Sequence, residues 1–192
     1  MSDRRGLSLD IYEPAEDSYL LAQACADEID GDERVLDVGT GTGYVAASIR
    51  EETGATVFGI DINPLACTRA ASHGIPVLRG DLVSAIDARC VDVVVSNPPY
   101  LPTSPEEERS DWLSVAVSGG PTGREVLRRL LADVGRVLRP DGRVYVLVSS
   151  LMDVERVRET AGERGFTATE IARDDRFPFE VLSVLRLDRE RS

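Results

Sequence analysis

The stretch VLDVGTGTG at residues 35–43 decides the fold of this chain. It begins with a short apolar run that predicts a strand, and glycines at every second position follow before a helical pattern begins. Glycine lets the backbone approach a ligand closely and adopt conformations that other residues avoid. A strand, a glycine-rich turn and a helix in this order are typical of an α/β domain that binds a ligand at the carboxyl edge of a parallel sheet.

The rest of the chain continues this alternation, which predicts a doubly wound α/β fold over a single domain, residues 1–192. Short apolar runs predict parallel strands at 35–38, 56–60, 75–78, 91–95 and 144–148. Helical patterns lie at 16–28, 43–53, 64–72, 123–138 and 153–164. Two further strand candidates, joined by a polar loop, predict a terminal antiparallel hairpin at 166–172 and 181–187.

Prolines add three expectations. Pro14 fits the first turn of the first helix. Pro76 cannot donate to a ladder, so the third strand is expected at an edge of the sheet. Residues 97–122 are rich in proline and predict a long irregular loop after the fourth strand, at the edge where open α/β sheets bind their ligands.

Composition limits the class of protein. The chain has 34 acidic residues against 22 basic ones, all arginine, and its net charge is -12. Acidic excess without lysine is typical of proteins from a high-salt cytoplasm, where it reports the habitat alone; the alternative interpretation is that it argues against direct binding to nucleic-acid phosphates. The sequence shows no secretory signal and no apolar run long enough to span a membrane, which predicts a cytoplasmic protein. The three cysteines are far apart and His73 is the only histidine, so neither a disulfide framework nor a metal site is expected.

The glycine spacing and the nearby acids indicate the ligand. Dinucleotide sites use G-x-G-x-x-G around a pyrophosphate, whereas this loop reads G-x-G-x-G and follows Asp37. Asp37 would repel an anion but attract an ammonium and a sulfonium, which predicts S-adenosylmethionine beside Gly39 and Gly41. Asp61 and Asp81 follow the next two strands and are expected to accept the ribose hydroxyls and the adenine amino group. Each acid alone also fits a helix N-cap, and the loop alone also fits a turn without a ligand.

The motif SNPPY at 96–100 follows the fourth strand and indicates the methyl acceptor. A planar amide or exocyclic amino nitrogen is a poor nucleophile whose two N–H groups need acceptors when buried. The side-chain oxygen of Asn97 and the carbonyl of Pro98 are expected to accept both hydrogens, while Tyr100 lies flat on the planar group. These residues are the candidate catalytic residues of a methyltransferase. The alternative interpretation is a proline-rich turn that closes a strand.

Motifs along nearly the whole chain are shared with one family. They are YEPAEDS at 12–18, the glycine loop at 39–43, DINP at 61–64, DL at 81–82, NPPY at 97–100, Trp112, GG at 119–120 and GRE at 123–125. On these motifs the chain resembles the HemK-like glutamine methyltransferases, particularly the eukaryotic and archaeal branch that modifies class-1 translation release factors. NPPY alone is shared with DNA adenine and some RNA guanine methyltransferases, whereas the opening YEPAED is more specific to this branch.

The resemblance implies a Rossmann-like class I methyltransferase fold with a seven-stranded mixed sheet in the order 3-2-1-4-5-7-6. It also implies S-adenosylmethionine-dependent N5-methylation of the glutamine side chain in the Gly-Gly-Gln motif of a release factor. Carried over by position, the cofactor contacts are Ser18, Asp37, Gly39, Asp61, Asp81, Leu82 and Asn97. Ser18 stands where relatives often have threonine, and both residues keep a hydroxyl. Asn97 would also touch the glutamine, which Pro98 and Tyr100 would frame.

The resemblance further implies a heterodimer with a small zinc-binding activator subunit that covers an apolar surface and the sheet edge. The short apolar edge strand at 75–78 is open to strand addition, which supports this expectation. Rival interpretations are an N6-adenine methyltransferase of DNA or RNA, a catalytically silent scaffold and a nucleotide-dependent oxidoreductase. The glycine spacing disfavours the oxidoreductase, the intact NPPY disfavours the scaffold, and no cluster of arginine and aromatic residues indicates a site for a nucleic-acid strand.

Overall fold

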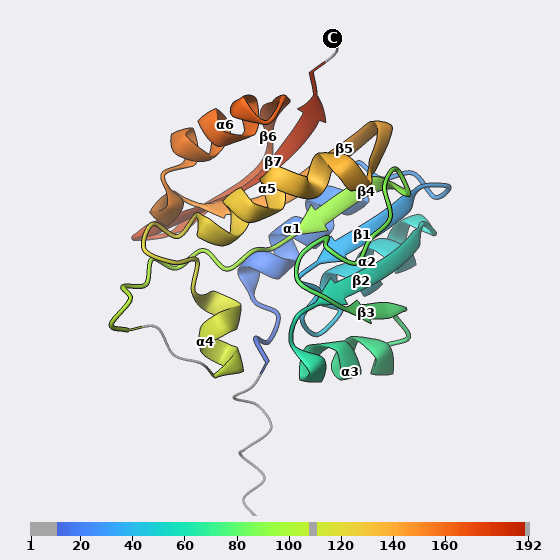
Figure 1. Ribbon diagram of the computed structural model, residues 1–192, viewed down its shortest axis with the longest axis horizontal. Coiled ribbons are helices and arrows are strands. Elements are labelled where there is room, and N and C mark those ends of the chain that lie inside the picture. Colours follow the sequence, from blue (N-terminus) through green and yellow to red (C-terminus); the bar gives the residue numbers. More distant parts are fainter. Residues whose placement is uncertain (1–10, 108–110, 191–192) are drawn as a thin grey trace, which may run out of the picture.

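The computed structural model describes residues 11–107 and 111–190, and their strands form one seven-stranded sheet (Figure 1). The strand order is β3-β2-β1-β4-β5-β7-β6. The first five strands pair in parallel, and β7 runs antiparallel to both β5 and β6. The strands are β1 (Arg34–Val38), β2 (Thr56–Asp61), β3 (Val77–Arg79), β4 (Val91–Ser96), β5 (Leu138–Ser149), β6 (Phe166–Phe177) and β7 (Glu180–Arg189). The predicted doubly wound fold, strand order and terminal hairpin are confirmed.

Helices cover both faces of the sheet (Figure 1). They are α1 (Glu16–Ala26), α2 (Tyr44–Thr53), α3 (Pro64–Ser72), α4 (Trp112–Val117), α5 (Glu125–Val137) and α6 (Val154–Glu163), with a 3-10 turn η1 (Ser150–Met152). Buried side chains of α5 and α6 form a core cluster with one face, and those of α1, α2 and α3 form a second cluster with the other. Within the described ranges, no helix is both long and apolar enough to cross a membrane.

The central strands contribute to both clusters. Successive side chains of a strand point to opposite faces, so Val35 of β1 joins the α1–α2 side while Leu36 joins the α5–α6 side. In β5, Tyr145 and Val146 divide in the same way. A parallel strand that is buried on both faces reads as a continuous apolar run, which is why these strands were predictable.

Two predicted boundaries near prolines are wrong by one or two residues. The strand predicted at 75–78 is Val77–Arg79, so Pro76 lies before β3 and not within it. Proline has no N–H to donate, so the ladder begins after it. Pro14 precedes Ala15, the N-cap of α1, and therefore lies outside the first turn of that helix.

The proline-rich segment at 97–122 is not irregular throughout, because it contains α4. The Asp111 side chain accepts a hydrogen bond from the Ser114 backbone N–H at 3.0 Å, which caps this short helix. Prolines on the N-terminal side of the helix obscured its pattern in the sequence.

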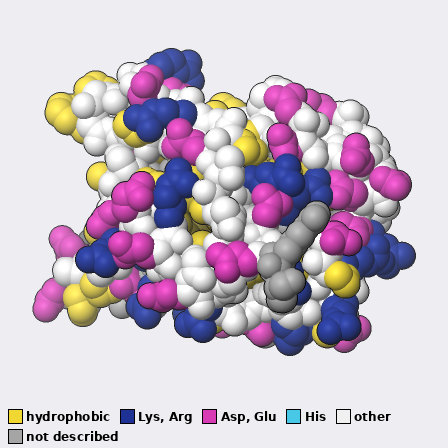
Figure 2. All heavy atoms as spheres, turned by 90° about the horizontal axis from the view of Figure 1, so that it is seen from above, with side chains coloured by type: hydrophobic (Ala, Val, Ile, Leu, Met, Phe, Trp, Pro, Cys, Tyr) yellow, Lys and Arg dark blue, Asp and Glu magenta, His cyan; other side chains and the backbone are white. Residues whose placement is uncertain are grey.

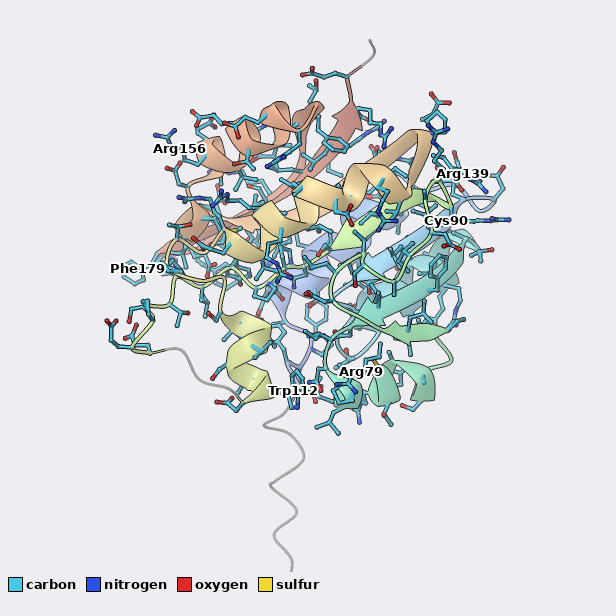
Figure 3. All side chains as sticks on the ribbon, viewed as in Figure 1. Arg79, Cys90, Trp112, Arg139, Arg156 and Phe179 are labelled. Carbon is cyan, nitrogen blue, oxygen red and sulfur yellow. The ribbon has the colours of Figure 1, made fainter. Side chains whose placement is uncertain are left out.

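The terminal hairpin is longer than predicted, and the turn Pro178-Phe179 replaces the expected polar loop. Phe179 is 92% exposed at the tip, where it points away from the body of the protein (Figure 3). Strand β6 lies at the sheet edge and exposes many of its side chains, so its apolar pattern ends before the strand does.

The turn after β1 requires glycine at Gly43, and Gly54 at the end of α2 provides a matched control. Both have positive φ, 82° and 79°, but an added Cβ would lie 3.0 Å from Ala70 only at Gly43. Gly54→Ala is expected to lower the free energy of unfolding by about 1–2 kcal/mol through backbone strain alone. Gly43→Ala also crowds α3 and should cost at least about 1 kcal/mol more. Urea unfolding measures both losses, and equal losses would contradict the tight packing of this turn.

Candidate active site

A cavity lies at the carboxyl ends of β1, β2 and β4, where the start of α1 approaches the sheet. Parallel strands end at the same edge, so residues far apart in the chain meet there. Every residue predicted to bind the cofactor lines this cavity: Ser18, Asp37, Gly39, Gly41, Asp61, Asp81, Leu82 and Asn97. Two predicted catalytic residues are not among the lining residues: Pro98 is buried, and Tyr100 is half-buried against the core.

The glycine loop crosses the end of β2 in a conformation that favours glycine. Gly39, Gly41 and Gly43 have φ of 74°, 56° and 82°, which side chains disfavour. The Gly39 N–H donates to the Ile60 carbonyl at 2.8 Å, and the Gly41 N–H donates to Asp61 Oδ2 at 2.9 Å. The loop is therefore attached to the neighbouring strand, and its backbone lines the cavity.

Asp37 is a buried carboxylate at the end of β1, with only 2% of its surface exposed. Its Oδ2 accepts a hydrogen bond from the Thr40 hydroxyl at 2.7 Å. Burial raises the pKa of Asp37 to about 7, while the Thr40 bond opposes this rise and the charge of Asp61 adds to it. Since a buried negative charge gains strongly from a nearby positive one, this end of the cavity fits a cationic ligand.

Asp61 is held at the end of β2 by backbone donors. Besides Gly41, the Asn63 N–H donates to its Oδ1 at 2.8 Å. Burial raises the pKa of Asp61, and these hydrogen bonds oppose the rise. The N-cap of α3 is Asn63, whose side chain accepts from the Leu65 N–H at 2.9 Å. Asp61 is therefore not the cap of α3, and its carboxylate lines the cavity.

Asp81 has a partner that the sequence did not indicate. Arg129 of α5 forms an ion pair with it, Nη2 to Oδ2 at 2.5 Å, and both residues line the cavity. Their side chains are 59% and 46% exposed, and exposed pairs contribute only about 0–1 kcal/mol. Opening this pair therefore costs little free energy. Nothing in the sequence distinguishes Arg129 from the other arginines of α5, because only the packing of that helix brings it to Asp81.

Asn97 directly follows β4 and presents an unpaired polar atom. Ser96 anchors the strand end, since its hydroxyl donates to the Val38 carbonyl at 2.9 Å. The Oδ1 of Asn97 is buried without a hydrogen-bond partner, and no other buried side-chain nitrogen or oxygen of the described residues is in this state. Leaving such an acceptor unpaired costs about 1–3 kcal/mol. An N–H donor of a bound molecule is the natural partner for it.

Tyr100 is half-buried against the core and is not among the residues that line the cavity. Its ring packs against both core clusters, and the charge of Asp17 in the first turn of α1 acts on its hydroxyl. Burial and the negative charge of Asp17 raise the pKa of the Tyr100 hydroxyl, which therefore remains a donor. Stacking of the ring on a planar acceptor stays a prediction.

Helix α4 adds an apolar rim that sequence reasoning also missed. Trp112, Val115 and Ala116 line the cavity, although no residue of α4 is itself buried. Trp112 lies on the side of α4 that faces α3 (Figure 3). Apolar walls with a few polar groups are typical of sites for small organic ligands.

These features fit S-adenosylmethionine. The carboxylates of Asp37 and Asp61 match a ligand that carries positive charges and ribose hydroxyls. The glycine loop has no side chains at Gly39 and Gly41, so the ligand can lie close to its backbone. In the described ranges, no group of three or more His, Cys, Asp or Glu residues is arranged to hold a metal ion. The sheet order, the glycine loop, the acids after β1 to β3 and the amide after β4 together define an S-adenosylmethionine-dependent class I methyltransferase.

Comparison with known proteins identifies the family. The methyltransferase small domain family matches residues 15–111. A putative protein N5-glutamine methyltransferase of Methanocaldococcus jannaschii is 35% identical over 92% of this chain and 90% of its own length. Methyltransferase HEMK2 of Mus musculus is 38% identical over 96% of this chain and 92% of its own. The solved E. cuniculi Mtq2-Trm112 complex, described as responsible for methylation of the translation termination factor eRF1, has a TM-score of 0.75 and 30% identity over 94% of this chain and 99% of that chain.

The chain therefore belongs to the HemK-like protein N5-glutamine methyltransferases. The family predicted from its motifs is confirmed, as is its use of S-adenosylmethionine.

The raised pKa of Asp37 predicts that cofactor affinity depends on pH. Above the pKa of about 7 the carboxylate is charged and attracts the sulfonium and ammonium groups, whereas below it the neutral acid does not. Calorimetric titration should show affinity falling by up to about tenfold as the pH drops by two units through this value. Asp37→Asn should bind weakly with no such dependence, and a wild-type affinity that does not change with pH would contradict the assignment.

The free energy of unfolding without cofactor is expected to fall as the pH rises, whereas cofactor affinity is expected to rise. The folded protein holds the Asp37 proton more tightly than the unfolded chain, where the pKa is 3.8, so wild-type stability without cofactor falls as the pH rises from 3.8 to about 7. Asp37→Asn lacks this contribution. The free energy of unfolding of the wild type, relative to that of Asp37→Asn, is therefore expected to fall as the pH rises.

Proposed function

We propose that this protein methylates the side-chain amide nitrogen of the glutamine in the Gly-Gly-Gln motif of a class-1 translation release factor. The observation that carries the proposal is the buried, unpaired Oδ1 of Asn97 at the carboxyl end of β4. A carboxamide NH2 supplies the donor that this oxygen requires. Two relatives support this substrate. The M. jannaschii relative is a putative protein N5-glutamine methyltransferase, and the E. cuniculi Mtq2-Trm112 complex is described as responsible for methylation of eRF1.

Asn97 would both orient and activate the amide. Its Oδ1 accepts one N–H of the glutamine, and the Pro98 carbonyl is expected to accept the other. These two acceptors fix the plane of the amide and aim its nitrogen into the cavity. The two prolines restrict the backbone, so the acceptors are in place before the substrate binds.

The same contacts strengthen during the reaction. When bound, the cofactor supplies a methyl group as an electrophilic carbon on sulfonium sulfur. The amide nitrogen would form a bond to this carbon as the carbon–sulfur bond breaks, the sulfur would keep the bonding electrons as a neutral thioether, and one amide proton would pass to water. Positive charge develops on the nitrogen, so its hydrogen bond to Asn97 Oδ1 is stronger in the transition state than in the ground state. This hydrogen bond therefore lowers the activation free energy of methyl transfer.

We propose that the protein works as a heterodimer with a small zinc-binding activator subunit at the β3 edge. Among the described residues, strand β3 ends the sheet and has β2 as its one neighbour. Leu78 is 49% exposed there, and Ile62 and Leu65 beside it are 44% and 40% exposed. An apolar sheet edge of this kind is suited to strand addition. The E. cuniculi relative Mtq2 was solved in complex with Trm112, which supports such a partner.

We further propose a cytoplasmic protein adapted to high salt. Its basic residues are all arginine, and acidic residues exceed them by 34 to 22. On the face shown in Figure 2, acidic and arginine side chains are interspersed and form no continuous basic stripe. Dense carboxylates that hold water are soluble when concentrated cations screen their repulsion.

Asn97→Ala should abolish methyl transfer, with a loss of at least about a hundredfold in kcat, because the amide loses its acceptor in the transition state. Cofactor affinity should change little, since the cofactor retains its carboxylate contacts. Transfer from labelled S-adenosylmethionine to purified release factor measures kcat, and calorimetry measures cofactor affinity. A variant with near wild-type kcat would disprove this mechanism.

The substrate itself is tested with a variant release factor. Labelled methyl should appear on the wild-type factor and be absent when the glutamine of its Gly-Gly-Gln motif is changed to alanine, with the activator subunit present in both reactions. Labelling of DNA or RNA instead would identify an adenine methyltransferase. Cofactor binding without labelling of any of these substrates would favour a silent scaffold.

Leu78→Glu should prevent assembly with the activator subunit, because a charge at the centre of an apolar contact is costly to bury. Leu151→Glu is the matched control, since Leu151 is 43% exposed on η1, which contacts β7 at the opposite side of the sheet. Co-purification and sedimentation measure assembly. Equal binding by the two variants would place the interface elsewhere.

A further inference from the structure

Arg129 lines the cofactor cavity but has no role in the mechanism above. It lies near the start of α5, three residues after Val126, which lines the same cavity. Residues three apart share one side of a helix, so this side of α5 faces the cavity. The helix is anchored by side chains that are buried in the core, Leu127, Leu130 and Leu131. The packing of α5 therefore holds Arg129 at the cavity wall.

Arg129 connects α5 to the loop after β3 through the side chain of Asp81. Its Nη2 donates to Asp81 Oδ2 at 2.5 Å. The backbone of that loop is fixed by other contacts. The Gly80 N–H donates to the Asp61 carbonyl at 2.9 Å, and the Ser84 N–H donates to the carbonyl of residue 81 at 3.1 Å. Arg129 therefore acts on the direction of the Asp81 side chain and not on the path of the loop.

Each of the three acids that line the cavity after a parallel strand is held by a donor. Asp37 accepts from a hydroxyl, and Asp61 accepts from two backbone N–H groups. Asp81 is exposed, whereas Asp37 is buried and Asp61 is half-buried. An exposed side chain that is not held adopts several rotamers, and fixing one of them on binding lowers affinity. Arg129 is the donor that holds Asp81 before a ligand arrives.

A carboxylate held in this way suits an adenine base. It accepts at both oxygens, so Asp81 can keep Arg129 at Oδ2 and still accept an exocyclic amino N–H with its remaining lone pairs. A 6-oxo purine carries a carbonyl oxygen in place of that amino group, and two acceptors would then face each other. A carboxylate that is fixed cannot turn away from the wrong base, whereas a mobile one can.

We propose that Arg129 is a positioning residue of the cofactor site, which fixes the Asp81 carboxylate that accepts the adenine amino group and so makes the site selective for adenine. The inference concerns recognition of the cofactor. It goes beyond the choice of methyl acceptor and holds or fails whether or not a release factor is the substrate.

Calorimetric titration of the full-length protein with two ligands tests the proposal. S-adenosylhomocysteine and S-inosylhomocysteine differ only at the base, where the second has a 6-oxo group instead of the amino group. The wild type should bind the adenosyl ligand at least about tenfold more tightly. Arg129→Gln should lower this ratio by about twofold to fivefold, the range expected for the loss of an exposed ion pair. Arg129→Lys should retain most of the ratio, because an ammonium still donates to the carboxylate.

Arg128→Gln is the matched control, since Arg128 is exposed on the same helix and is not among the residues that line the cavity. It should bind both ligands as the wild type does. An Arg129→Gln ratio equal to that of the control would overturn the proposal. Tighter binding of S-adenosylhomocysteine by Arg129→Gln would also overturn it, because Arg129 would then compete with adenine for Asp81. Thermal unfolding of both variants should match the wild type, as expected for exposed substitutions.

A double variant tests whether Arg129 acts through Asp81. Asparagine can turn its NH2 toward a 6-oxo group, so Asp81→Asn should lower the ratio further than Arg129→Gln does. Adding Arg129→Gln to Asp81→Asn should then change the ratio no more, since the two changes remove one interaction. A further decrease in the double variant would show that Arg129 contacts the base itself and would contradict the positioning role.

Discussion

Parallel strands that end at one edge of the sheet are the constraint on which the site depends. Strands β1 and β4 are neighbours, and the chain order of the sheet reverses between them. Ligands of open α/β sheets bind at such a switch point. At this switch point Asp37 and Asp61, from the ends of β1 and β2, lie in one cavity with Asn97, which follows β4. The glycine loop then closes over the edge, because Gly41 donates its N–H to Asp61.

The cavity contains groups that are unfavourable to bury without a partner. Burial raises the pKa of Asp37 to about 7, and Asn97 Oδ1 lacks a hydrogen bond. Each lowers the stability of the protein without ligand, and each is satisfied by one part of the proposed reactants, a cation for the acid and an N–H for the amide oxygen. Elsewhere the two apolar clusters supply the stability that permits such a site.

The sequence predicted the parts of the fold whose pattern is local. Strands β1, β2 and β4 and the second half of β5 are apolar runs with few alternatives, and the glycine loop has a recognisable spacing, whereas the polar start of β5 at Leu138 was not predicted. The short helix α4 was missed because prolines precede it, and β3 was misplaced because its ladder begins only after Pro76.

The residues of the site likewise divide into those that the sequence predicted and those that it did not. Residues that directly follow a strand were predictable, because the edge of the sheet fixes where they lie. Arg129 was not identified, since its contact with Asp81 depends on how α5 packs against the loop after β3. Tyr100 was expected to present its ring to the acceptor, and no sequence pattern indicated that it packs against both core clusters.

The proposed function requires that Asn97 hold the amide of a glutamine. A crystal structure with S-adenosylhomocysteine and a Gly-Gly-Gln peptide of the release factor tests this requirement most directly. The glutamine side-chain nitrogen is expected within about 3 Å of Asn97 Oδ1, with the sulfur of the cofactor product on the far side of that nitrogen. An Asn97 side chain that binds another group of the protein, with the glutamine held elsewhere, would contradict it.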